Sequence, residues 1–105
     1  MRSRRSAGRE RRGSVKHAGV DALDDLEPLL TALRTIGVLK EKKRGTFYRG
    51  GRAFLHFHED SAGLFADVRL AQDFERIRVS TADEQARLLE RVRTAVDQPA
   101  SGASA

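Results

Sequence analysis

Two histidines separated by one residue have the clearest potential for chemistry in this sequence. His56 and His58 lie in a segment that is typical of a β-strand, where a spacing of two directs both imidazoles to one side of a sheet. Asp67, on the next predicted strand, is expected on the same side. Two imidazoles and a carboxylate can hold a divalent metal ion, and an imidazole alone can make binding depend on pH near neutrality.

A second arrangement of these side chains needs no metal. One imidazole would hydrogen-bond Asp67, and the other would lie near Glu59 and Asp60 in the turn that follows. The choice depends on the strand register and on a second shell of partners, neither of which the sequence identifies. We therefore assign no metal ligand and no cofactor from the sequence alone.

The histidines belong to a longer alternation, from Thr46 to Val79, that separates the residues into two surfaces. One surface is almost wholly apolar and contains Tyr48, Ala53, Leu55, Phe57, Leu64, Ala66, Val68, Leu70, Ile77 and Val79. The other is rich in phenylalanine, arginine and histidine, and its predicted ligand-binding residues are Phe47, Arg49, Arg52, Phe54, His56, His58, Phe65, Arg69, Arg76 and Arg78. We expect the first surface to form a core, and the second to face away from the helices and bind a ligand.

The second surface suits more than one kind of partner. Bases of single-stranded nucleic acid stack on aromatic rings while guanidinium groups reach phosphates. A patch of four exposed rings, at positions 47, 54, 65 and 74, could instead be buried by a second copy, by another protein or by the chain's own termini. A small anionic ligand is a further alternative. We predict a binding domain of unidentified ligand, with nucleic acid as the sharpest hypothesis and a homodimer or protein-interaction module as the alternative.

Motifs of catalysis are missing from the sequence. It contains no cysteine, no G-x-S-x-G elbow and no glycine-rich phosphate loop of the Walker or Rossmann type. We therefore assign no catalytic residue and predict no enzymatic activity.

Two helices and four strands are expected to position these residues. The first helix is predicted over residues 26–36, where leucines and an isoleucine recur at helical spacing. A charged connector follows at 40–45, and strands are predicted at 46–49, 52–58, 64–70 and 74–79. Ser80 or Thr81 opens a closing helix, and Thr81 forms an S/T-x-x-E capping box with Glu84.

Gly50 and Gly51 predict a tight hairpin, because glycine accepts the positive φ angles of a type I′ turn. This turn would place Phe47 opposite Phe54 and hence on the same face. The elements together predict an α+β fold in α-β-β-β-β-α order: a two-layer domain whose four-stranded antiparallel meander is covered on one face by an N-terminal and a C-terminal helix.

The hairpin segment Thr46-Phe47-Tyr48-Arg49-Gly50-Gly51-Arg52-Ala53-Phe54 resembles that of the small bacterial MmcQ/YjbR-like proteins. The order of helix, Gly-Gly hairpin, further strands and closing helix is similar as well. The resemblance implies a fold associated with suspected DNA binding. The chain has no tryptophan and so lacks the late His-Trp segment of that family, and the resemblance assigns no functional residue here.

The charge of the chain is concentrated at its start. The net charge is +5, but residues 1–18 hold seven cations and one anion, whereas residues 19–105 hold 13 cations and 14 anions. We expect a disordered basic arm over 1–20, which could bind nucleic acid or result from an over-long gene start, then one α+β domain over 21–97 and a disordered tail over 98–105. No apolar run could span a membrane and no secretory signal is visible, so we predict a cytoplasmic protein without a membrane partner.

Overall fold

The computed structural model describes residues 16–97 of the 105-residue chain. Residues 1–15, which make up most of the predicted basic arm, and the predicted tail at 98–105 lie outside the described residues. Residues 16–20 were predicted as part of the arm, but they form a short strand and the start of a helix.

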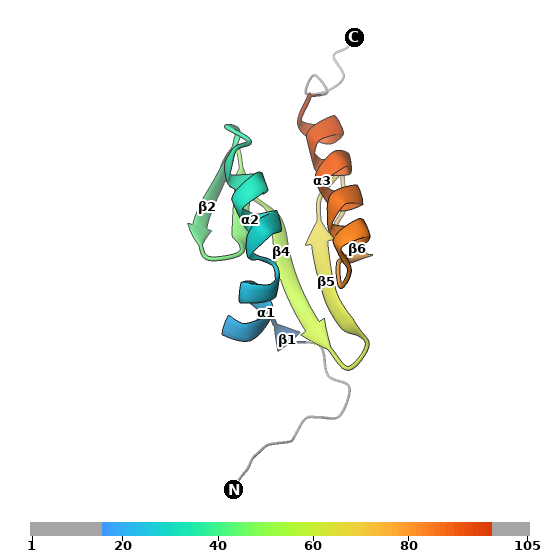
Figure 1. Ribbon diagram of the computed structural model, residues 1–105. Helices are drawn as coiled ribbons and strands as arrows, with labels where there is room; N and C mark the ends of the chain where they lie inside the picture. Colours follow the sequence, from blue (N-terminus) through green and yellow to red (C-terminus); the bar gives the residue numbers. More distant parts are fainter. Residues whose placement is uncertain (1–15, 98–105) are drawn as a thin grey trace, which may run out of the picture.

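The described chain folds into an antiparallel sheet with three helices on one of its faces (Figure 1). The helices are α1 (Val20–Asp25), α2 (Glu27–Arg34) and α3 (Ala82–Asp97). The strands are β1 (Lys16–His17), β2 (Leu39–Lys43), β3 (Thr46–Arg49), β4 (Arg52–Asp60), β5 (Gly63–Val68) and β6 (Glu75–Arg78). The predicted α+β class is therefore correct. Within the described part of the chain, none of the helices is long and apolar enough to cross a membrane.

The predicted meander is present as β3 to β6, but the sheet is wider than four strands. Its order is β2-β3-β4-β5-β6, and β1 pairs with β4 outside this path. The segment predicted as a charged connector forms β2, whose Leu39 is buried and whose Glu41 pairs with Phe47. Pairing with β3 and burial of one leucine outweigh the low strand propensity of its lysines, since tertiary context commonly overrides such propensities.

The helix predicted over 26–36 is present as α2, and a further helix that was not predicted, α1, precedes it and meets it at Leu26. Proline lacks an amide hydrogen and its ring collides with the carbonyl four residues earlier, so Pro28 cannot continue a helix that began at Val20. Pro28 instead lies in the first turn of α2, where no intrahelical donor is required.

Helix α3 begins as its sequence predicts. The Thr81 hydroxyl accepts a hydrogen bond from the Glu84 amide at 3.1 Å, and a Glu84 carboxylate oxygen accepts one from the Thr81 amide at 3.0 Å. This reciprocal pair satisfies two amides at the start of the helix. Helices α2 and α3 then bury one leucine-rich stripe each against the sheet, and the core residues from α3 are Leu88 and Val92.

The β3–β4 hairpin contains the main departure from the predicted register. Gly50 and Gly51 have φ angles of 58° and 81° and make the expected turn, with Tyr48 opposite Ala53. A bulge then places Phe47 opposite Leu55, so the predicted pairing of Phe47 with Phe54 is wrong. A bulge places two residues of one strand opposite a single residue of the partner strand. The alternation of side chains between the two faces is therefore shifted by one residue on one side of the bulge.

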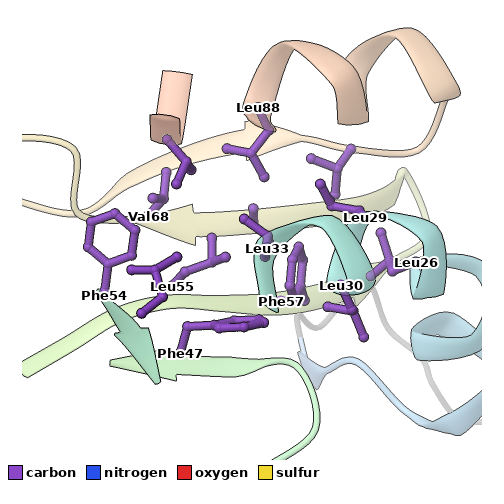
Figure 2. Packing of buried hydrophobic residues seen from close by; sticks show 14 residues of the cluster. Leu26, Leu29, Leu30, Leu33, Phe47, Phe54, Leu55, Phe57, Val68 and Leu88 are labelled. Carbon is purple, nitrogen blue, oxygen red and sulfur yellow. The ribbon is translucent and has the colours of Figure 1, made fainter. Parts of the chain in front are cut away.

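The bulge moves two rings into the core. Phe47 and Phe54 are only 1% and 2% exposed, and Figure 2 shows both among the buried side chains of the hydrophobic cluster. Tyr48 and Ala53, predicted for the apolar surface, take the opposite face. Burying two phenylalanine rings removes a large apolar area from water, which favours this register over the predicted one.

Beyond the bulge the predicted alternation is correct. Leu55 and Phe57 of β4 face Val68 and Ala66 of β5 in register, and all four side chains are buried. The neighbouring positions, which include His56, His58 and Asp67, therefore lie on the face of the sheet that carries no helix.

Candidate functional site

We call the face of the sheet opposite the three helices the outer face. Cross-strand partners in an antiparallel sheet share a face, and the register couples His56 with Asp67, His58 with Phe65, Phe65 with Arg78 and Asp67 with Arg76. On β2 and β3 the same face carries Lys40 and Tyr48, which are also partners. The outer face consists of Lys40, Lys42, Tyr48, Ala53, His56, His58, Asp60, Phe65, Asp67, Arg69, Phe74, Arg76 and Arg78, together with His17 of β1.

All three histidines of the chain meet on the outer face. Strand β1 pairs with β4 so that His17 is opposite His58, and their ring centroids are 5.2 Å apart. The centroids of His56 and His58 are 4.8 Å apart, and those of His17 and His56 are 6.1 Å apart. We call these three residues the imidazole cluster.

Asp67 lies beside the imidazole cluster and is held in place by Arg76. The guanidinium donates two hydrogen bonds to the carboxylate, Nε to Oδ1 at 2.8 Å and an Nη to Oδ2 at 2.9 Å. These bonds from Arg76 are the main cause of a lowered pKa of Asp67, to which the positive potential of His58 also contributes. Asp67 is therefore ionised at neutral pH, with its oxygens fixed in direction.

Three ring nitrogens of the imidazole cluster are buried without a hydrogen-bond partner: Nδ1 of His56 and both nitrogens of His58. The Nε2 atom of His58 is at ion-pair distance from Asp67, 2.9 Å from Oδ2, although no hydrogen bond joins the two atoms. Burial lowers the pKa of His56, and the neighbouring His58 lowers it further. Because that shift favours the neutral ring, the His56 lone pair is available to a ligand.

An aromatic ring flanks the cluster on one side. Phe74 is 39% exposed and packs edge-on against His56, with ring centroids 5.4 Å apart. The guanidinium of Arg69 lies 4.4 Å over the Phe74 ring and donates to the carbonyl oxygens of Ala53 and Gln72. These contacts hold the ring and the cation in one orientation at the edge of the site.

Tyr48 provides a second half-exposed ring, and Lys42 extends over it at 4.7 Å from the centroid. Lys40 is exposed on the neighbouring position of β2. The outer face thus has a basic aromatic end at β2 and β3 and an imidazole-rich end where β1 meets β4.

The structure separates the residues predicted to bind ligand into three groups. His56, His58, Phe65, Arg69, Arg76 and Arg78 lie together on the outer face. Phe47 and Phe54 lie in the core, so their predicted place on a binding surface is wrong. Arg49 and Arg52 pair with each other next to the turn and, by the alternation of the strands, point to the side of the sheet that the helices occupy.

His17 and Tyr48 were missed by the sequence interpretation, which placed the lysines of β2 in a connector that could contact phosphates and not on the sheet. A two-residue strand shows no alternation that a pattern search could detect, so the place of His17 is set by its pairing with β4 alone. Tyr48 was assigned to the wrong face because the bulge that reverses the parity of β3 was not foreseen.

Comparison with known proteins finds no match for this chain among models of protein families, among curated proteins or among solved structures. The chemistry of the outer face is therefore the basis for assigning a function.

Proposed function

We propose that this protein is a non-enzymatic binding domain that holds single-stranded nucleic acid on its outer face. The observation that carries the proposal is the combination of three rings, Tyr48, Phe65 and Phe74, with five cations on a sheet face that no helix of the described chain covers. Bases stack on such rings at about 1–3 kcal/mol each, and cations between them contact phosphates.

Charge on the outer face supports a polyanionic partner. The cations are Lys40, Lys42, Arg69, Arg76 and Arg78, against the two acids Asp60 and Asp67. Arg76 is paired with Asp67 and Arg78 with Glu84, yet their side chains are 45% and 48% exposed. A guanidinium has five N–H donors, so each arginine keeps donors for a phosphate while its ion pair is intact.

The burial of Phe47 and Phe54 in the core weakens the alternative of a homodimer. With those rings in the core, the outer face has no continuous four-ring patch for a second copy to bury. A symmetric dimer would also set the cations of two outer faces against each other, which like-charge repulsion disfavours. The resemblance of the hairpin to MmcQ/YjbR-like proteins favours nucleic acid too, and it stays a prediction.

The experiment is a fluorescence-anisotropy titration of a labelled single-stranded oligonucleotide with the untagged chain, at several salt concentrations. We expect affinity to fall steeply with salt as phosphate contacts release counterions. The variant Phe74→Ala should weaken binding by roughly 5- to 150-fold, the equivalent of one stacked base.

A pair of matched double variants separates the outer face from general attraction to positive charge. Lys40→Ala with Lys42→Ala removes two cations from the outer face, and Arg87→Ala with Arg93→Ala removes two exposed cations from α3. Only the first pair should weaken binding. An equal effect of both pairs would refute the proposed site, and a dimer that Phe74→Ala converts to monomer in sedimentation, without oligonucleotide binding, would favour the alternative.

A further inference from the structure

We propose that the outer face also contains a binding site for one divalent transition-metal ion, with His56, His58 and Asp67 as ligands and His17 as a fourth. This site does not depend on nucleic-acid binding. One ligand atom from each of the first three residues lies within 4.8 Å of the others. Zinc bonds of about 2.0–2.1 Å to nitrogen place tetrahedral ligand atoms about 3.3 Å apart, so small side-chain rotations close the set.

The unpartnered nitrogens are the second observation that points to an ion. His58 is only 8% exposed, and its Nδ1 lacks a hydrogen bond, as does Nδ1 of His56. The Nε2 atom of His58 has no hydrogen bond either, and its near neighbour is Oδ2 of Asp67, another member of the proposed ligand set, at 2.9 Å. A buried polar atom without a partner costs about 1–3 kcal/mol, and native proteins rarely leave such atoms unpaired. A metal ion coordinated by one nitrogen of each ring would satisfy two of the three atoms with a strong bond.

Arg76 orients the carboxylate of the proposed ligand set. Its guanidinium donates to Oδ1 of Asp67 at 2.8 Å and to Oδ2 at 2.9 Å. Arg76 thus occupies the position of an outer-shell partner that orients a metal-binding carboxylate.

The composition of the site indicates which ions it selects. Nitrogen-rich sets with one carboxylate suit Zn²⁺, Co²⁺, Ni²⁺ and Cu²⁺, whereas Mg²⁺ and Ca²⁺ require oxygen ligands. His17 reaches the cluster from β1, with its ring 5.2 Å from that of His58. Because the chain has three histidines and no cysteine, all of its imidazole ligands are in this one cluster.

The test is a titration of the untagged full chain with Co²⁺ alone, followed by visible absorption, and with Zn²⁺ by calorimetry. We expect one ion per chain and no competition from Mg²⁺. His56→Gln and Asp67→Asn should each weaken Zn²⁺ binding by more than the roughly tenfold that loss of an outer-shell partner causes. His17→Gln should weaken it less, because its ring is exposed and farther from His56.

Asp60→Asn is the matched control, since it removes a carboxylate from the outer face outside the ligand set. Its affinity for Zn²⁺ should equal that of the unaltered chain. Far-UV circular dichroism of every variant checks that the fold is retained, and Asp67→Asn, which is isosteric, keeps the test decisive if His56→Gln fails to fold. Absence of binding, equal affinity of the ligand variants and the unaltered chain, or an equal loss in Asp60→Asn would each overturn the site.

Discussion

At the scale of single residues, the two phenylalanines on either side of the Gly-Gly turn show how much depends on one inserted position. The sequence suggested that Phe47 and Phe54 stack bases, whereas the bulge assigns both rings to the core. Alternation identifies two faces, but it cannot locate a bulge, because the bulge is selected by how the rings pack against α2 and α3. The residues past the bulge, such as His56 and Asp67, follow the pattern and could be predicted.

The position of Phe54 leads to a direct prediction about stability. Phe54→Ala should lower the free energy of unfolding by about 3–5 kcal/mol, the usual cost of removing a buried aromatic ring. Phe74→Ala, which alters a ring that is 39% exposed, should cost much less. Urea denaturation of both variants measures the difference. Similar small losses in the two variants would mean that Phe54 is not a core residue.

At the scale of elements, an ion network joins α2 to β2. Arg34 at the end of α2 contacts both Glu27 and Glu41, and Arg44 reaches back to Glu27 at 2.8 Å. Glu41 also accepts a hydrogen bond from the amide of Gly45 at 2.9 Å, in a turn where Gly45 has a φ of 83°. The network adds to the pairing with β3 and the burial of Leu39, which make an edge strand of a lysine-rich segment that appeared to be a connector.

We predict that Glu41→Ala destabilises the fold by about 1.5–3 kcal/mol at neutral pH, the range for hydrogen bonds to a charged group. Arg34 lowers the pKa of Glu41 in the folded state below its ordinary value of 4.5. This contribution is complete above pH 4.5 and is lost as the pH falls below it, because the unfolded chain then binds a proton more readily. Urea denaturation across pH should show the variant and the unaltered chain converging in acid.

Glu90→Ala serves as the control for this prediction, because Glu90 is an exposed acid on α3. It should leave the free energy of unfolding nearly unchanged at all pH values. A difference between Glu41→Ala and the unaltered chain that stays constant down to low pH would contradict the role given to the Glu41 charge.

At the scale of the whole molecule, the sequence predicted the α+β class and the central meander, but it did not predict strands β1 and β2, which lie outside that meander. The hairpin, the capping box and the apolar face follow from local rules that operate within a few residues. Strand β1 and the imidazole cluster depend on a contact between residue 17 and residue 58, which no local pattern contains. The candidate metal site could thus be predicted only in part, as His56, His58 and Asp67 without His17.

The contact of β1 with β4 can be tested by removing one hydrogen bond. The amide of Ala18 donates to the carbonyl of Phe57 at 3.2 Å, and Ala18→Pro removes that donor. We expect faster hydrogen exchange at the amide of Glu59, which is paired with Lys16 on the β1 side of β4, and lower Zn²⁺ affinity, as His17 leaves the cluster. Ala18→Gly keeps the donor and is the control; unchanged exchange in Ala18→Pro would show that β1 is not held by this bond.

Strand β1 has a further consequence for how the molecule behaves in a crowded solution. Strand β4 runs to Asp60, whereas β3 pairs only with its first half, and the two residues of β1 occupy the same side farther along. Without the two residues of β1, the amides and carbonyls on that side of β4 would be unpaired. They could then pair with a strand of another molecule, which is a common cause of aggregation through sheet edges. The shortest strand of the sheet therefore covers a stretch of β4 backbone that would otherwise be an unpaired sheet edge.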